Sequence, residues 1–236
     1  MAFHSFASTG IRMQDDDHDR PNVTVDVVLL TIVDDRLMVA LAPRDKEPFK
    51  GVPAIIGGYV HTEPGADRDT DDTAHRVLRE KVGLDGIFIE QLFTFAGPDR
   101  DPRGWSVSVA YFALVPLFRL SDSLGRLTLV PADSPGDLPF DHTRIVRTAL
   151  DRVRGKGAYS VLPARLLPPS FTMTELQRTY EVVMGQRLDK SSFRRKMGDL
   201  DLLEEEAAPR AATADIRRPS RAYRLKADAG VFDRRI

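Results

Sequence analysis

The sequence predicts two units in one chain, a mixed α/β domain followed by a smaller helix-turn-helix domain with a wing. Strand-like runs with interleaved helical patterns extend to about residue 154, and two short capped helical patterns follow. The charge also changes sign between these parts: residues 1–154 carry 18 Lys and Arg against 24 Asp and Glu, whereas residues 155–236 carry 16 against 11. A basic C-terminal third on an acidic body indicates that this third binds a polyanion, although ordinary solubility charge is the alternative.

The first part of the chain shows two kinds of pattern. Runs of β-branched and aromatic residues bounded by polar turns are typical of strands, and the Asp pair between the first two runs is typical of a tight hairpin. Apolar residues at helical spacing, begun by Asp and ended by Gly, are typical of a capped helix. The expected elements are strands over 23–33 and 36–42, a helix from Asp71 or Asp72 to Val82 ended by Gly83, strands over 86–95, 105–117 and 127–130, and a closing helix over 140–154.

The second part begins with two helices joined by a turn. Thr172 and Glu175 have the spacing of a capping box, and Gly185 is expected to end the helix that they begin. Asp189 or Ser191 is expected to begin the next helix. This order, helix, turn, helix, is the core of a helix-turn-helix domain.

The wing follows the second of these helices. Phe193 and Met197 are four residues apart, so we expect them to form the buried side of that helix. Two short strands are expected over 202–206 and 222–226, with a long Ala-, Pro- and Arg-rich loop between them. The predicted organisation is a mobile arm over 1–21, the α/β domain over 22–155 and the winged helix over 156–236.

Composition excludes several classes of protein. The chain has no Cys, which rules out disulfides, thiol catalysis and thiolate metal sites, and none of its five His residues forms a pair with metal-ligand spacing. No apolar run reaches membrane-span length, and the N-terminal residues have no apolar core of the signal-peptide type. We therefore expect a cytoplasmic protein that does not contact membranes.

The segment over 55–84 carries the strongest motif of the first part. It resembles the Nudix box, a loop–helix–loop in which helix glutamates hold Mg²⁺ against a pyrophosphate. The end of the box aligns through Arg76, Leu78, Glu80, Gly83 and Leu84. The segment before it is about four residues longer than in the box, and Glu63 is a candidate for the displaced glutamate.

Two positions of the box depart from the metal-binding pattern. Val77 stands where the first helix glutamate belongs, and Lys81 stands where the last one belongs. Mg²⁺ needs several hard oxygen ligands, so a site that has lost two carboxylates and gained an ammonium is not expected to hold it. Without the metal, nothing activates water for hydrolysis. We predict ligand binding without turnover, with no catalytic residue and no metal. The alternatives are a helix that only packs against the sheet, and an active ADP-ribose pyrophosphatase with an unusual metal site.

The whole chain over about 22–226 is similar to the NrtR family, Nudix-related transcriptional repressors of NAD metabolism. The resemblance rests on VDVVLLTI from Val25, DRDPRGWSVSVAY from Asp99, LPFDH from Leu138, and FTMTELQRTYEVVMG with SFRRKMGDLDLL in the second part. It implies an α/β Nudix-like sandwich followed by a winged helix-turn-helix. It further implies a homodimer on a palindromic operator in double-stranded DNA, and repression of NAD biosynthesis or salvage genes that is relieved by ADP-ribose or a related nucleotide. No cofactor is required.

Candidate residues follow for both sites. Cations and two glycines of the first domain are expected to bind the diphosphate, with Phe49 as a stacking surface, and Arg103 has a salt bridge with Asp101 as its alternative. The helix KSSFRRK and the wing are expected to bind DNA, or, as the alternative, RNA or a protein. The ligand residues are Arg44, Phe49, Lys50, Gly57, Gly58, Arg76, Arg79, Glu80, Lys81 and Arg103, and the DNA residues are Lys190, Ser191, Ser192, Arg194, Arg195, Lys196, Arg217, Arg218 and Arg221.

Overall fold

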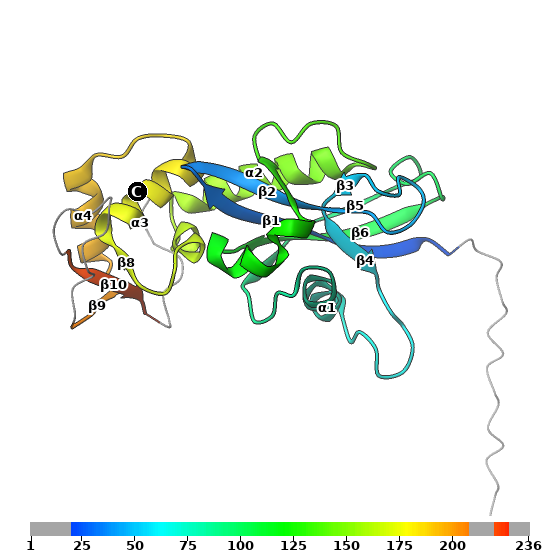
Figure 1. The fold of residues 1–236 in the computed structure, drawn as a ribbon, viewed down its shortest axis with the longest axis horizontal. Coiled ribbons are helices and arrows are strands. Elements are labelled where there is room, and N and C mark those ends of the chain that lie inside the picture. Colours follow the sequence, from blue (N-terminus) through cyan, green and yellow to red (C-terminus); the bar gives the residue numbers. More distant parts are fainter. Residues whose placement is uncertain (1–19, 208–219, 227–236) are drawn as a thin grey trace, which may run out of the picture.

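A mixed sheet with one helix on each face forms the larger part of the molecule, in a computed structural model that describes residues 20–207 and 220–226 (Figure 1). The strand order is β3-β2-β1-β6-β5, and in addition β4 pairs with β1 and β7 with β2. β1 and β6 run parallel, whereas the other pairs are antiparallel. The elements are β1 (Asn22–Val33), β2 (Arg36–Pro43), β3 (Pro53–Ala54), β4 (Ile56–Tyr59), α1 (Thr70–Val82), β5 (Ile89–Gly97), β6 (Ser106–Leu114), the 3₁₀ helix η1 (Leu117–Arg126), β7 (Thr128–Pro131) and α2 (His142–Gly157).

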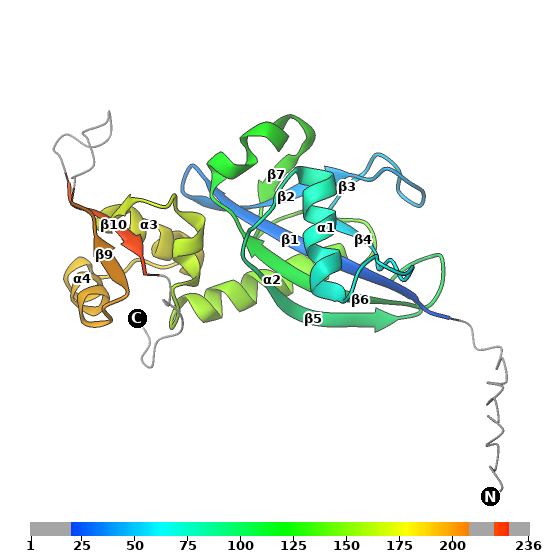
Figure 2. The same cartoon turned by 90° about the horizontal axis from the view of Figure 1, so that it is seen from below.

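The smaller part is a pair of helices beside a three-stranded sheet (Figure 2). β10 lies in the middle of this sheet and pairs antiparallel with β8 and β9. Its elements are the 3₁₀ helix η2 (Leu162–Leu166), β8 (Phe171–Thr172), α3 (Met173–Met184), α4 (Lys190–Asp199), β9 (Leu203–Glu205) and β10 (Ala222–Leu225). This order confirms the predicted helix-turn-helix with a wing.

β1 is buried on both faces because alternate residues point to different helices. Val25, Val27 and Leu29 lie in the core that includes α1, whereas Val28 and Leu30 lie in the core that includes α2. The near-continuous apolar run of this strand is therefore a property of a central strand covered by a helix on each side.

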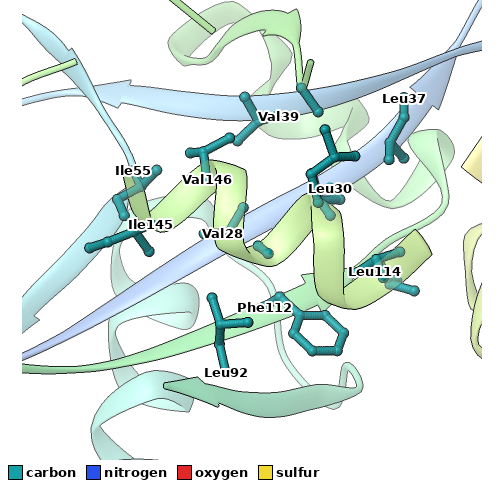
Figure 3. Close-up of a cluster of buried hydrophobic side chains, with 14 of the residues drawn as sticks. Val28, Leu30, Leu37, Val39, Ile55, Leu92, Phe112, Leu114, Ile145 and Val146 are labelled. Atoms are coloured by element: carbon teal, nitrogen blue, oxygen red, sulfur yellow. The ribbon is translucent and has the colours of Figure 1, made fainter. Parts of the chain in front are cut away.

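Figure 3 shows the core between the sheet and α2. Leu30 of β1, Val39 of β2 and Phe112 of β6 belong to one buried cluster with Ile145 and Val146 of α2. These side chains are almost completely buried. The same cluster continues along α2 as far as Val153, so one side of this helix packs on the sheet.

The predicted helix boundaries are confirmed in part. The N-cap of α1 is Asp69, whose carboxylate accepts a hydrogen bond from the Asp72 amide at 2.8 Å, so Asp71 and Asp72 lie in the first turn and do not cap it. The predicted end at Gly83 is confirmed, with φ 66°. α2 begins two residues later than predicted because Phe140 has a positive φ of 55°, which a helix does not allow.

Capping in the smaller part agrees with the sequence. Thr172 and Glu175 form the predicted capping box, and Gly185, with φ 69°, ends α3. Asp189, one of the two candidates, caps α4 by accepting a hydrogen bond from the Ser192 amide at 2.8 Å. Short polar side chains therefore set both helix starts, as their spacing predicts.

α2 leads directly from one part to the other, and Figure 2 shows it passing behind the sheet and ending beside α3. The predicted limit after residue 155 falls inside this helix, and the domain limits stay a prediction. Residues 1–19 of the expected arm lie outside the described residues. Within the part of the chain that is described, no helix is long and apolar enough to cross a membrane.

Candidate functional site

A cleft of about 310 Å³ lies between β1, β4, the second half of α1 and the loops that precede β3, β6 and α2. Its volume is at the small end of the range for small-molecule sites. Seven predicted ligand residues line it: Arg44, Gly57, Gly58, Arg76, Glu80, Lys81 and Arg103. The other three, Phe49, Lys50 and Arg79, are exposed and do not line it.

The two glycines bring parts of the protein itself close together. A Cβ atom at Gly57 would lie 2.3 Å from an oxygen of Asp26, and one at Gly58 would lie 2.8 Å from a methyl carbon of Val77. The sequence suggested that these glycines allow close approach of a ligand. In the structure they allow close approach of a buried carboxylate and of α1.

Arg76 is fully occupied by groups of the chain. Its Nε and Nη2 donate to the Asp67 carboxylate at 2.7 Å each, and Nη2 also donates to the Tyr59 carbonyl at 2.9 Å. The Asp67 side chain is 4% exposed, and its hydrogen bonds from Arg76 hold the pKa of its carboxyl group well below the usual range. Arg76 therefore anchors the inserted loop through Asp67, and its Nη1 also donates to Glu80 at 3.2 Å.

Arg103 forms the salt bridge with Asp101 that was the predicted alternative to a ligand contact. Its Nη2 lies 2.6 Å from one Asp101 oxygen and its Nε 2.9 Å from the other, and these hydrogen bonds raise the pKa of Arg103. The guanidinium carbon also lies 5.3 Å from the ring centre of Tyr59 and 5.7 Å from that of Phe140. Arg103 thus links Asp101, Tyr59 and Phe140 in one wall of the cleft, and it also lines the cleft itself.

Arg44 and Lys81 differ from these arginines because neither forms an ion pair with a carboxylate in residues 20–207 or 220–226. Arg44 donates from Nε to the Pro48 carbonyl at 2.7 Å and lies 4.6 Å above the Phe140 ring. Burial lowers its pKa, and Arg103 lowers it further. Desolvation lowers the pKa of Lys81, and the repulsion from Arg44 adds to this against the attraction of Asp45 and Asp26. Arg44 and Lys81 are therefore partly desolvated cations that an anion would stabilise, and Lys46, which also lines the cleft, is exposed.

A polar group at the bottom of the cleft was not foreseen. Asp26, 7% exposed, accepts from Ser108 Oγ at 2.6 Å and lies 3.5 Å from Arg100 and 3.7 Å from the His142 Nε2. Desolvation lowers the pKa of His142, so the imidazole is neutral at pH 7. The one signal in the sequence was a carboxylate, Asp26, inside the apolar run of a buried strand.

The box positions that would hold a metal do not provide a carboxylate set. Val77 is 1% exposed and belongs to the core, and Lys81 brings a positive charge to the cleft. Of the residues that the structure describes, no three His, Asp or Glu side chains are arranged to hold a metal ion.

The second site is the outer face of α4. Phe193 and Met197 are 1% and 2% exposed, as predicted, and they fix which side of the helix faces inward. Arg194 and Arg195 are consequently exposed on the other side. Lys190, Ser191 and Ser192 are also exposed at its N-terminal end, whereas Lys196 is partly buried.

The wing is described only in part. Arg221 is exposed and forms an ion pair with Glu205 at 3.2 Å, so its charge is already balanced. A second pair of the wing, Arg224 with Glu204 at 3.0 Å, repeats this arrangement. The predicted DNA residues Arg217 and Arg218 lie outside the described residues.

Comparisons with known proteins agree in both parts of the chain. The model of the NrtR DNA-binding winged helix domain matches residues 163–225. An Acinetobacter baylyi protein named ADPR responsive transcriptional repressor NtrR is 37% identical over 218 residues, which cover 90% of this chain and 85% of that protein. A crystal structure of Shewanella oneidensis NrtR with a 27mer DNA superposes with a TM-score of 0.82 and 34% identity, covering 91% of this chain and 99% of that one. A MutT/nudix family protein from Enterococcus faecalis superposes with a TM-score of 0.69 and 28% identity, covering 89% of each chain.

Proposed function

Because the chain belongs to the NrtR family, with its Nudix-like domain and winged helix, we propose that it is a transcriptional repressor of NAD biosynthesis or salvage genes. It binds its operator through the winged helix and releases it when ADP-ribose or a related nucleotide occupies the cleft. The observation that carries this proposal is one chain that joins a cleft lined by partly desolvated cations, Arg44 and Lys81, to a helix with an exposed basic face. We assign ligand sensing to residues 22–155 and DNA binding to residues 156–236.

Arg44 and Lys81 are the proposed partners of the diphosphate. No described carboxylate forms an ion pair with either of them, and both are partly desolvated, so an anion gains more from them than from the exposed Lys46, which also lines the cleft. Phe140, which Arg44 covers, and Arg103 offer faces for a base or a ribose. ADP-ribose is the proposed effector because the Acinetobacter relative is named as responsive to it.

We propose that the cleft binds this nucleotide without hydrolysing it. A bound Mg²⁺ would have to share the cleft with the Lys81 ammonium, and the buried Val77 supplies no carboxylate at the other altered position of the box. Glu80 still lines the cleft and is the feature that favours the rival, a pyrophosphatase. Release of AMP from ADP-ribose at ordinary enzyme rates, with Mg²⁺ or Mn²⁺ present, would establish that rival.

On the DNA side, α4 is the proposed reading helix. Arg194 and Arg195 are exposed where base edges can be reached, and Lys190, Ser191, Ser192, Lys196 and Arg221 lie where backbone phosphates are expected. We propose that two chains bind as a symmetric dimer, which requires a palindromic operator. Such a repressor acts on the chromosome, so we place it in the cytoplasm.

The test is binding of the full chain to duplex fragments from upstream of NAD genes, with and without ADP-ribose. We expect a specific shift on one palindromic fragment, here called the operator duplex, and its loss when ADP-ribose is added. A shift that ignores DNA sequence would contradict operator recognition. A specific shift that ADP-ribose leaves unchanged would contradict the sensor role.

A further inference from the structure

We propose that α2 is the element that carries the effector signal, with Asp141 and Gly157 as the coupling residues at its two ends. This inference rests on the proposed function, since it concerns how an occupied cleft alters the DNA-binding part. It requires that α2 touch the cleft at its start, behave as one body along its length, and touch the DNA-binding part at its end.

The start of α2 is held by the cleft and not by its own cap. Asp141 is the N-cap residue, but its carboxylate makes no capping hydrogen bond in the described structure. It is instead bound by Arg100, whose Nη2 and Nε lie 2.9 and 3.2 Å from its two oxygens. Arg100 lines the cleft and is 8% exposed at its side chain. A phosphate that attracts Arg100 releases Asp141, which is then free to cap the helix.

Two further features of this helix start are energetically unfavourable. Phe140 has the left-handed φ of 55°, which is unfavourable for an aromatic residue, and Arg44 covers its ring at 4.6 Å. The Nδ1 atom of His142 is buried without a hydrogen-bond partner among the described groups. An anion that draws Arg44 toward itself removes the contact of Arg44 with the Phe140 ring, and this contact helps to stabilise the unfavourable φ of Phe140. A shift of the helix start that gives the Nδ1 atom of His142 a hydrogen-bond partner is favourable, because a buried polar atom without one is costly.

The body of α2 is a single packed helix. Its 16 residues correspond to about 24 Å of length. Ile145, Val146, Ala149 and Val153 are all completely buried in the core shared with the sheet. A helix held by such a continuous row of contacts moves as one piece, so a displacement at its start reaches its end.

The end of α2 lies directly against the end of α3. A Cβ atom at Gly157 would be 3.3 Å from Cγ of Met184 and 3.5 Å from a methyl carbon of Val183. Two residues earlier, a Cβ atom at Gly155 would meet nothing within 4 Å. α3 is the first helix of the helix-turn-helix, and Val183 also belongs to the core that α2 shares with the sheet. Movement of α2 at this point therefore moves the helix that positions α4.

The two glycines offer a matched pair of variants for the full chain. Gly157→Ala and Gly157→Leu fill the contact with α3 to different extents. Gly155→Ala and Gly155→Leu are the same substitutions two residues earlier, where a Cβ atom meets nothing within 4 Å. The measurement is the coupling ratio, the Kd for the operator duplex with saturating ADP-ribose divided by the Kd without it. Direct titration confirms that each variant still binds ADP-ribose.

We expect the coupling ratio to fall about threefold in Gly157→Ala and about tenfold or more in Gly157→Leu, within the range of known coupling variants, and to stay within about twofold of the wild type in both Gly155 variants. Equal ratios at the two positions would overturn the inference. If Gly157→Leu does not fold, as judged by its melting temperature, the alanine pair decides the question.

Asp141→Asn tests the other end of the helix. The amide removes the nearer of the two carboxylates that hold Arg100 and leaves Asp26, so we expect ADP-ribose to bind at least as tightly as to the wild type, while the coupling ratio falls by about threefold or more. An unchanged ratio would contradict the role of Asp141. Failure of the proposed function is distinguishable, because the wild-type chain itself would then show no effect of ADP-ribose on operator binding.

Discussion

Positive charge has different partners in the cleft and on α4. In the cleft, Arg76, Arg100 and Arg103 each bind a carboxylate of the chain, whereas Arg44 and Lys81 lie in a partly desolvated space and form no ion pair with a described residue. On α4, Lys190, Arg194 and Arg195 lie in water, and no ion pair neutralises them within the described residues.

The difference indicates what each site can distinguish. A fixed pair of cations in a desolvated cleft favours one small anion of matching shape and is little affected by salt. A row of solvated cations attracts any polyanion and depends strongly on salt, so specificity there must come from a few contacts to base edges. Four predictions test this contrast.

The largest effect is expected for Lys81→Glu. Reversing the charge turns an attraction for the diphosphate into a repulsion, and a contact of unit charges is worth about 4 kcal/mol at an effective dielectric of 20, of which a partly solvated site retains a fraction. We expect the Kd for ADP-ribose, measured by calorimetry, to rise about a hundredfold or more. Operator binding without ADP-ribose stays unchanged.

Arg79→Glu is the matched control for this variant. Arg79 lies two residues earlier on the same helix and makes the same change of net charge, but it is exposed and does not line the cleft. It should change the Kd for ADP-ribose by about threefold at most. Equal losses in the two variants would mean that the general charge of α1, and not the cleft, attracts the ligand.

Asp67→Asn tests whether the ion pair of Asp67 with Arg76, the arginine of the box, stabilises the fold. Removing one partner of this buried pair should lower the free energy of unfolding by about 2–3 kcal/mol at pH 7, measured by urea denaturation. The folded-state pKa of Asp67 is depressed, so its contribution is present above about pH 4 and is lost as the pH falls below that value. The difference between wild type and variant should therefore shrink in acid.

The exposed pair of Arg68 with Asp72 provides the comparison for Asp67. Asp72→Asn should leave the urea midpoint nearly unchanged, because both partners are solvated. A loss in Asp72→Asn as large as that in Asp67→Asn would show that the burial of the Asp67 pair has no special effect.

Arg195→Ala tests base reading on α4. If Arg195 contacts a base edge, its loss should weaken binding to the operator duplex by about 1–3 kcal/mol and binding to random duplex by much less. Arg221→Ala is the control from the wing, where Glu205 already balances the charge, and should have a smaller effect on both. Equal losses of Arg195→Ala on both duplexes, in a mobility-shift titration, would assign Arg195 to the phosphates.

The smallest effect is expected for Lys190→Ala. A lysine at the start of α4 that contacts only phosphate should lower affinity for all sequences alike and reduce the slope of log K against log salt by about 1. Binding measured at several salt concentrations checks this slope. A change in sequence preference without a change in slope would contradict the assignment.

Local features of the fold were predictable from the sequence. The hairpin between β1 and β2, the capping box of α3 and the buried pair on α4 all depend on residues within a few positions of each other. The N-cap of α1 was assigned two or three residues too late, because Asp69, Asp71 and Asp72 are equally suitable as isolated residues. Only the path of the preceding loop decides among them.

The pairing of charges in the cleft was not predictable in the same way. Asp67 and Arg76 are nine residues apart across an inserted loop, and Arg100 reaches Asp141 across 41 residues. Sequence shows that these charges exist but not which of them neutralise each other. That Arg76 contacts the ligand stays a prediction, because Arg76 lines the cleft but is paired with Asp67, whereas Lys81 has no such partner in the described structure.

The central claim is that Lys81 and Arg44 replace a metal ion as the partners of the diphosphate. Calorimetric titration of the full chain with ADP-ribose, once in EDTA and once in Mg²⁺, with the ligand recovered afterwards, tests it most directly. We predict the same Kd under both conditions and ADP-ribose recovered intact. Binding that requires Mg²⁺, with AMP and ribose 5-phosphate in the recovered material, would contradict the claim.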